Sequence, residues 1–124
     1  MSSGVTQIAD KDTHDTIVAE SWASTPTVVY VSNSALPACK ELTPKYEALA
    51  EEYSKRDGPQ QTVKFTQLEL SPETSYFFKF SPNQLPVAVL MSQGPWSRTI
   101  MSPKIKDLED GIAEMLERGG KLRN

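Results

Sequence analysis

Residues 27–50, TVVYVSNSALPACKELTPKYEALA, decide the fold of this 124-residue chain. Residues 27–31 are β-branched or aromatic without alternating polar positions, which predicts a central strand covered on both faces. A short polar turn follows. The apolar positions Leu42, Tyr46 and Leu49 then recur with helical spacing. The stretch therefore predicts a buried strand that leads directly into a long helix.

The segments on both sides of this stretch continue the alternation of strands and helices. Strands are predicted at residues 5–8, 63–70, 87–91 and 96–101, and helices are predicted to start at Asp12, Ser71 and Ser102. Asp12 is expected to be the N-cap of the first helix, and Gly119–Gly120 to end the last one. A turn at residues 93–95 favours antiparallel pairing of the last two strands.

The resulting order, β-α-β-α-β-α-β-β-α, defines the predicted fold class. It combines parallel crossovers with one hairpin, so we expect an α/β protein with a mixed central sheet flanked by helices. A chain of 124 residues is long enough to bury one core and too short for two. Residues 1–124 are therefore expected to form a single domain.

Charge and hydropathy exclude several classes of partner. The net charge of −3 gives no basic field for nucleic acid or for an anionic membrane surface. The longest apolar run, residues 86–91, is far shorter than the roughly 20 residues that cross a bilayer. Residues 1–11 lack the apolar run of a secretory signal. We expect a cytoplasmic protein, and the nucleus is the alternative location.

Cysteine and histidine are each present once, as Cys39 and His14. A lone cysteine agrees with a reducing compartment and excludes an internal disulfide. His14 has no second candidate ligand near it, so no metal site is expected. The sequence also lacks a phosphate-binding glycine loop and a nucleophile elbow, and we expect no cofactor.

The chain resembles the thioredoxin family at two places. That family has an apolar strand, then Trp-Cys-Gly-Pro-Cys-Lys, then a helix with a proline five residues after the second cysteine; Cys39, Lys40 and Pro44 match the second half of this motif. In FSPNQLPVAVLMSQG, residues 80–94, Pro86 stands where the family has its cis-proline. The resemblance implies a thioredoxin-like fold.

The reactive positions depart from the family pattern. Leu36 replaces the attacking cysteine, Ala35 its tryptophan neighbour, and Pro37–Ala38 the Gly-Pro pair between the cysteines. Thiol exchange needs an exposed thiolate and a second thiol to resolve the mixed disulfide. The buried aspartate and the lysine that move protons in the family correspond to Tyr30 and Gln67. The resemblance therefore implies a protein without dithiol exchange.

A peptide-binding surface is the function that this pattern favours. In thioredoxin-like folds, the residue before the conserved proline offers its backbone to an extended substrate chain, a mode of binding known for peptides. The residues expected to line such a groove are Ala35, Leu36, Pro37, Leu85 and Pro86. We therefore expect a protein- or peptide-binding or scaffold module rather than an enzyme.

The alternative is a monothiol redox protein in which Cys39 is the catalytic residue. Cys39 would then accept glutathione or form a mixed disulfide with a protein partner. Two further roles stay open for this residue: a small buried hydrophobe, or a disulfide between two copies of the chain. The expected oligomeric state is a monomer or a weak dimer.

Overall fold

The computed structural model describes residues 5–8, 10–23, 25–33, 35–56, 63–69, 85–92, 96–101 and 103–123. Its elements are β1 (Thr6–Gln7), α1 (Lys11–Ala23), β2 (Thr27–Ser32), α2 (Pro37–Ser54), β3 (Lys64–Glu69), β4 (Val87–Ser92), β5 (Trp96–Met101) and α3 (Ile105–Arg123). The helix predicted to start at Ser71 and the turn at residues 93–95 lie outside the described residues.

The sheet is mixed and has five strands in the order β1-β3-β2-β4-β5. Strand β3 pairs in parallel with β1 and β2, whereas β4 pairs antiparallel with both β2 and β5. Every residue of β2 is buried, because this strand lies in the middle of the sheet and is covered on both faces. The predicted central strand, the mixed sheet and the antiparallel last pair are confirmed.

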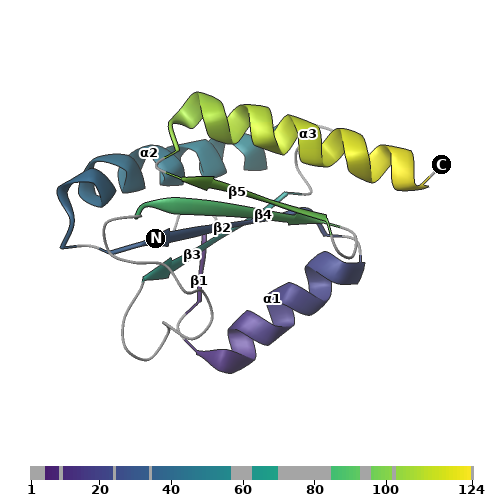
Figure 1. Cartoon of the computed structure of the whole chain (residues 1–124), viewed down its shortest axis with the longest axis horizontal. Helices are drawn as coiled ribbons and strands as arrows, with labels where there is room; N and C mark the ends of the chain where they lie inside the picture. Colours follow the sequence, from purple (N-terminus) through teal and green to yellow (C-terminus); the bar gives the residue numbers. More distant parts are fainter. Residues whose placement is uncertain are drawn as a thin grey trace.

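The helices lie on both faces of the sheet. Figure 1 shows α2 and α3 together on one face and α1 on the other. Alternate residues of β2 point to opposite faces, so Tyr30 joins the core under α2 and α3, and Val29 joins the core under α1. Helix α2 buries the apolar positions that its sequence spacing predicted. Cys39, also on α2, belongs to the α1-side cluster.

Helix ends differ from the sequence prediction at three places. The Thr13 N–H donates to Asp10 Oδ1 at 2.8 Å, so Asp10 caps α1 and Asp12 already lies within the first turn. This hydrogen bond lowers the pKa of the Asp10 carboxyl. Helix α3 begins two residues after Pro103 and continues through Gly119–Gly120 to Arg123. The predictions for Asp12, for the Ser102–Pro103 start and for the glycine end were wrong.

Helix α3 is amphipathic. Leu108, Ile112 and Met115 are fully buried against the sheet, whereas Lys106 and Glu117 are exposed. The Lys104 N–H donates to Asp107 Oδ2 at 3.0 Å, so a side chain of the first turn satisfies the backbone at the helix start. Within the described part of the chain, no helix is long and apolar enough to cross a membrane.

Candidate functional site

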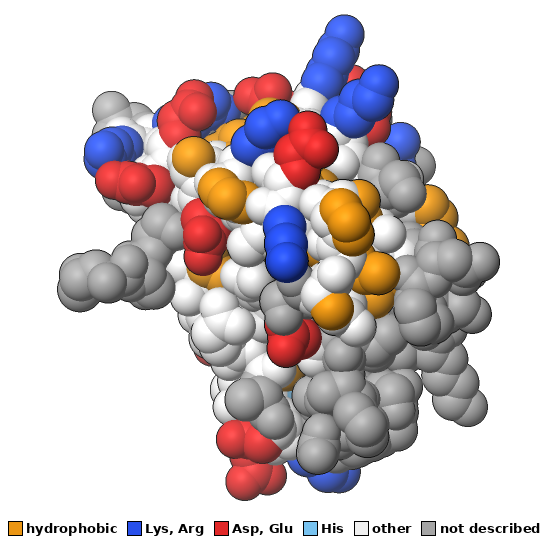
Figure 2. Space-filling view, turned by 90° about the vertical axis from the view of Figure 1, so that its left-hand side faces the viewer, with side chains coloured by type: hydrophobic (Ala, Val, Ile, Leu, Met, Phe, Trp, Pro, Cys, Tyr) orange, Lys and Arg blue, Asp and Glu red, His pale blue; other side chains and the backbone are white. Residues whose placement is uncertain are grey.

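The candidate site lies at the end of the sheet where β2 and β5 finish and β4, α2 and α3 begin, on the left-hand side of Figure 1. Figure 2 turns this face toward the viewer. Hydrophobic side chains appear there among lysine, arginine and acidic side chains. The face therefore offers apolar contact area surrounded by charged side chains.

Asn33 shapes the turn between β2 and α2. Its side-chain Oδ1 accepts a hydrogen bond from the Ala35 N–H at 2.9 Å, and its carbonyl accepts one from the Leu36 N–H at 2.9 Å. Asparagine favours such turns because its side chain can replace a backbone acceptor. Leu36 is the N-cap residue of α2, with extended backbone, and Pro37 follows as the first helical residue. These contacts hold the half-buried Leu36 side chain at the N-terminus of α2.

Cys39 lies in the first turn of α2 and has no solvent exposure. Its side chain belongs to the apolar cluster that contains Leu85 and Val87, and Leu36 packs against the same cluster. The Asn33 N–H donates to Cys39 Sγ at 3.5 Å. The single thiol of the chain is therefore enclosed by apolar side chains and one backbone donor.

A hydrogen-bonded chain connects the central strand to this first turn. Tyr30 Oη lies 3.1 Å from Thr43 Oγ1, and Thr43 Oγ1 donates to the Cys39 carbonyl at 2.7 Å. Because the Thr43 proton is used in this second bond, Tyr30 is the donor in the first. Tyr30 also stacks on Tyr46 with ring centroids 4.6 Å apart. Burial raises the pKa of Tyr30 to about 12, so its hydroxyl is neutral at physiological pH.

Gln67 is the register partner of Tyr30 across the parallel pair β2 and β3. Its side-chain Oε1 accepts a hydrogen bond from Gln7 Nε2 at 3.3 Å. An amide does not titrate, and the neighbouring phenol keeps its proton near neutral pH. This pair therefore lacks a group that accepts a proton under physiological conditions.

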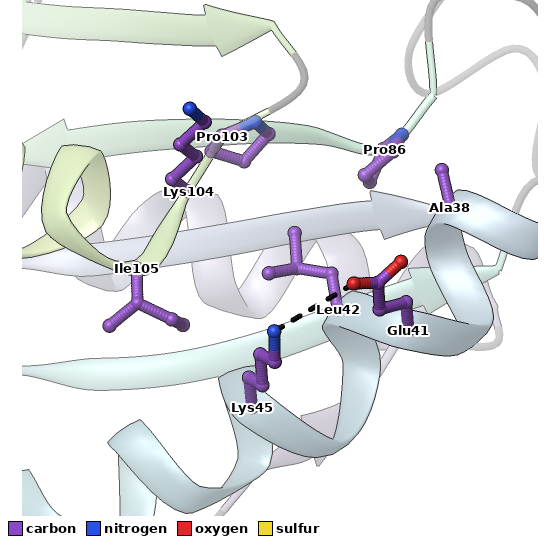
Figure 3. A pocket seen from close by; sticks show the side chains of 8 residues that line it. All are labelled: Ala38, Glu41, Leu42, Lys45, Pro86, Pro103, Lys104 and Ile105. Atoms are coloured by element: carbon purple, nitrogen blue, oxygen red, sulfur yellow. Dashed lines mark ion pairs between the residues drawn. The ribbon is translucent and has the colours of Figure 1, made fainter.

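A pocket of about 550 Å³ opens between α2 and the start of α3 (Figure 3). The residues that line it are Ala38, Glu41, Leu42, Lys45, Pro86, Pro103, Lys104 and Ile105. Ala38 and Pro86 lie close to each other at one end of the pocket. The peptide bond between Leu85 and Pro86 is cis. The pocket thus lies directly beside the first turn of α2.

The residues predicted to line a groove fall into three groups. Pro86 lines the pocket, Ala35 on the turn and Pro37 at the start of α2 are exposed, and Leu36 and Leu85 pack on the cluster around Cys39. All five belong to the turn before α2, its first residue, or the segment that enters β4. Pro86 alone among them lines the pocket.

Sequence reasoning missed the other wall of the pocket, formed by Pro103, Lys104 and Ile105. The signal that could have found it is the register of the last hairpin. Val87 pairs with Met101, so the residues just before β4 and just after β5 meet at the same edge of the sheet. Counting outward from the predicted turn would have placed Pro86 level with position 102, one residue before Pro103.

Metal binding finds no support among the described residues, which contain no group of three or more His, Cys, Asp or Glu side chains able to hold an ion. His14 Nδ1 lies 3.2 Å from Asp15 Oδ1 on α1. Zinc sites in proteins use three or four protein ligands.

A mixed sheet between helix layers, with a helix that begins beside a buried cysteine and a cis X–Pro bond, defines a thioredoxin-like α/β protein. The family model described as Thioredoxin matches residues 5–114, and the chain belongs to this family. The fold predicted from the sequence is therefore confirmed.

Solved thioredoxins superpose on the chain over most of its length. The long form of thioredoxin F from spinach chloroplast is 24% identical, with 91% of this chain and 87% of that chain covered and a TM-score of 0.74. Oxidized thioredoxin O1 from Arabidopsis thaliana is 13% identical, with coverage of 91% and 98% and a TM-score of 0.74. A chain from the complex of ferredoxin:thioredoxin reductase with thioredoxin f2 is 21% identical, with coverage of 91% and 96% and a TM-score of 0.72. A search of curated proteins found no match.

The burial of Cys39 predicts slow alkylation. We expect iodoacetamide to label the native thiol about a hundredfold more slowly than the thiol of the denatured chain, because a reagent reaches a buried group only in transiently open molecules. Mass spectrometry of quenched samples measures both rates. Equal rates in the native and denatured states would contradict the enclosure of this thiol.

Proposed function

We propose that the chain is a thioredoxin-family protein that binds an extended peptide segment of a protein partner and does not perform dithiol exchange. The surface that holds the peptide comprises the turn at Ala35–Pro37, the Leu85–Pro86 segment and the adjoining pocket. The observation that carries the proposal is Leu36, a leucine at the N-cap of α2 above a fully buried Cys39.

The absence of dithiol exchange follows from the chemistry at these two positions. Leu36 has no nucleophilic atom, and Cys39 is the only cysteine of the chain. A dithiol reductase needs one thiolate to attack and another to release the mixed disulfide. Tyr30, hydrogen-bonded through Thr43 to the Cys39 carbonyl, keeps its proton up to a pKa of about 12 and offers no base at neutral pH.

Binding is supported by the shape and composition of the surface. The pocket has the volume of a small ligand site and is lined mainly by apolar side chains. Ala35 on the adjoining turn and Pro37 at the start of α2 are exposed and offer contact area with little side-chain entropy to lose. Among the similar structures, thioredoxin f2 is seen in complex with ferredoxin:thioredoxin reductase, so a protein partner is a reasonable occupant here as well. We propose the cytoplasm or nucleus as the location, where a lone thiol stays reduced.

The alternative function is that of a monothiol redox protein in which Cys39 is the reactive residue. Cys39 lies in the first turn of α2, three positions after the N-cap residue Leu36. Glutathione or a partner cysteine must then reach a sulfur atom with no solvent exposure. The alternative therefore requires the Leu36 turn to open, and iodoacetamide labelling tests that requirement.

The binding proposal is tested by two arginine substitutions on the same helix. Ala38 and Ala48 are both exposed on α2, but only Ala38 lines the pocket. We expect Ala38→Arg to weaken the binding of extended peptides by about tenfold or more, since a bulky residue at the centre of a contact disrupts it. Fluorescence anisotropy with labelled decapeptides of alternating valine and threonine provides the affinity.

Ala48→Arg is the matched control and should bind these peptides as the wild type does. Circular dichroism of both variants checks that α2 remains folded. Similar affinities of the Ala38→Arg and Ala48→Arg variants would place peptide binding elsewhere. A wild-type chain that binds none of the peptides would argue against the proposed function itself.

A further inference from the structure

The pocket beside Pro86 combines an apolar floor with charged edges. Its floor is built mainly by side chains that are buried or partly buried: Leu42, Pro86, Pro103 and Ile105. Hydrophobic side chains packed in this way fit an aliphatic or aromatic group of a ligand. The charged edges decide which ligand residue can lie next to that group.

Positive charge exceeds negative charge among the side chains that line the pocket. Lys45 Nζ lies 3.9 Å from Glu41 Oε1, and the two side chains are 60% and 79% exposed. The two side chains of an ion pair this long and this exposed attract each other only weakly. The Lys104 side chain is exposed and forms no ion pair with any other residue in the described ranges. Among the lining side chains, two ammonium groups therefore accompany one loosely held carboxylate.

The two lysines approach the pocket from different elements. Figure 3 shows Lys45 on α2, near Glu41 and Leu42, and Lys104 on the segment before α3, beside Pro103. Pro86 and Ala38 close the end that adjoins the peptide surface of the proposed function. A peptide that passes Pro86 can thus place one side chain over the floor and a neighbouring one at a lysine.

We propose that this pocket selects an extended peptide in which an apolar residue is followed or preceded by an acidic residue. The apolar side chain occupies the floor, and Lys45 and Lys104 attract the carboxylate. This inference rests on the proposed function, because it names the chemistry of the same partner. The net charge of the whole chain is −3, so attraction for an acidic segment must come from these local lysines.

Spacing along a peptide is compatible with this arrangement. In an extended chain, adjacent residues are about 3.3 Å apart along the axis and point to opposite sides, and residues two apart share a side. An acidic residue one or two positions from the apolar one can therefore reach the charged edge. A lysine in the peptide would instead meet an excess of positive charge, which reduces binding to basic segments.

Peptides that differ at one position test the inference. Labelled decapeptides of alternating valine and threonine carry Glu, Gln or Lys at each position in turn, and anisotropy gives their affinities. We expect a Glu peptide to bind about three- to tenfold more tightly than its Gln counterpart, the range for one or two exposed charge pairs. This preference should shrink as sodium chloride is raised, because salt screens exposed charges.

Variants of the lysines assign the preference to the pocket. In the Lys45→Gln/Lys104→Gln double variant, Glu and Gln peptides should bind equally. Lys55→Gln is the matched control, because Lys55, the C-cap residue of α2, also forms an exposed i,i+4 pair, with Glu51 at 3.4 Å, but does not line the pocket. It should retain the full preference for glutamate.

The outcomes separate this inference from the function on which it rests. Equal binding of Glu and Gln peptides at every position, with binding still weakened by Ala38→Arg, would overturn the acidic preference and leave the peptide surface intact. A glutamate preference that survives in the double variant would overturn the role of the two lysines. Failure of every peptide to bind the wild type would overturn both proposals.

Discussion

The Leu36→Cys variant is expected to form a disulfide with Cys39 and to gain disulfide reductase activity that the wild-type chain lacks. Residue 36 is the N-cap of α2 and residue 39 lies in its first turn, so the two side chains are three positions apart on one helix end. This spacing brings Cβ atoms to about 5–6 Å, close enough for a disulfide after small adjustments. A thiol at residue 36 would also be more accessible than Cys39, because Leu36 is only half-buried.

The activity gained should be weak, because the variant restores the nucleophile but no base. Tyr30 has a pKa raised to about 12, and its partner Gln67 does not titrate. A positioned general base contributes about 10²- to 10⁴-fold to proton-transfer steps, so turnover should fall short of an ordinary thioredoxin by at least about 10²-fold. Insulin reduction by dithiothreitol, followed as turbidity, measures turnover above the uncatalysed rate.

Leu36→Ser is the matched control, since it removes the same leucine without adding a thiol. It should show no turnover above dithiothreitol alone, as should the wild type. Mass spectrometry after mild oxidation should find a loss of two hydrogens in Leu36→Cys only. Turnover in the wild type would contradict the absence of dithiol exchange. No disulfide in Leu36→Cys would show that residues 36 and 39 are not close enough to pair.

The central strand and the long helix could be predicted from the sequence because their patterns reflect burial. Residues 27–31 contain no polar alternation, and β2 is buried along its whole length. The spacing of Leu42, Tyr46 and Leu49 matches the buried face of α2. These patterns reflect which side chains pack against neighbouring elements, so the positions they mark are the ones buried in the folded chain.

Helix ends were predicted less well because several residues near each end can act as a cap. Asp10 and Asp12 are both suitable by type, and the path of the chain into α1 selected Asp10. Glycine permits a helix to end but does not require it, and α3 continues through Gly119–Gly120. Residue type alone could not decide between these alternatives.

The candidate site was predicted in part. The family resemblance placed Leu36, Cys39 and Pro86 near one another, and the structure puts them at one end of the sheet. The resemblance carried no information about Lys45 or Lys104, because those positions follow from the meeting of α2 with the start of α3. Contacts between distant segments leave no periodic signal in either segment.

Removal of the Tyr30 side chain is expected to cause the largest loss of stability among these variants. Tyr30 is fully buried, stacks on Tyr46 and hydrogen-bonds to Thr43. Tyr30→Ala should lower the free energy of unfolding by about 3–5 kcal/mol, as other buried aromatic truncations do. Tyr30→Phe keeps the ring and should cost only about 1 kcal/mol for the lost hydrogen bond. Urea denaturation followed by circular dichroism measures both.

A double-mutant cycle with Thr43→Val isolates the hydrogen bond from the packing of the ring. Tyr30 Oη and Thr43 Oγ1 are 3.1 Å apart, so Tyr30→Phe and Thr43→Val should be non-additive. Strict additivity would mean that the two hydroxyl groups do not interact in solution. A small effect of Tyr30→Ala, below about 1 kcal/mol, would contradict the burial of this ring.

The raised pKa of the Tyr30 hydroxyl predicts how the stability of the protein changes at alkaline pH. The pKa of Tyr30 is about 12 in the folded chain against 10.0 ordinarily, so between these values the folded state keeps a proton that the unfolded state releases. The stabilisation is complete below pH 10 and is lost as pH rises through the folded pKa. Tyr46 and Tyr53 also have raised pKa values, so Tyr30→Phe should reduce the alkaline loss rather than abolish it. Urea midpoints of both proteins, compared from neutral pH to about pH 11, should converge as the pH rises, because only the wild type loses the contribution of Tyr30.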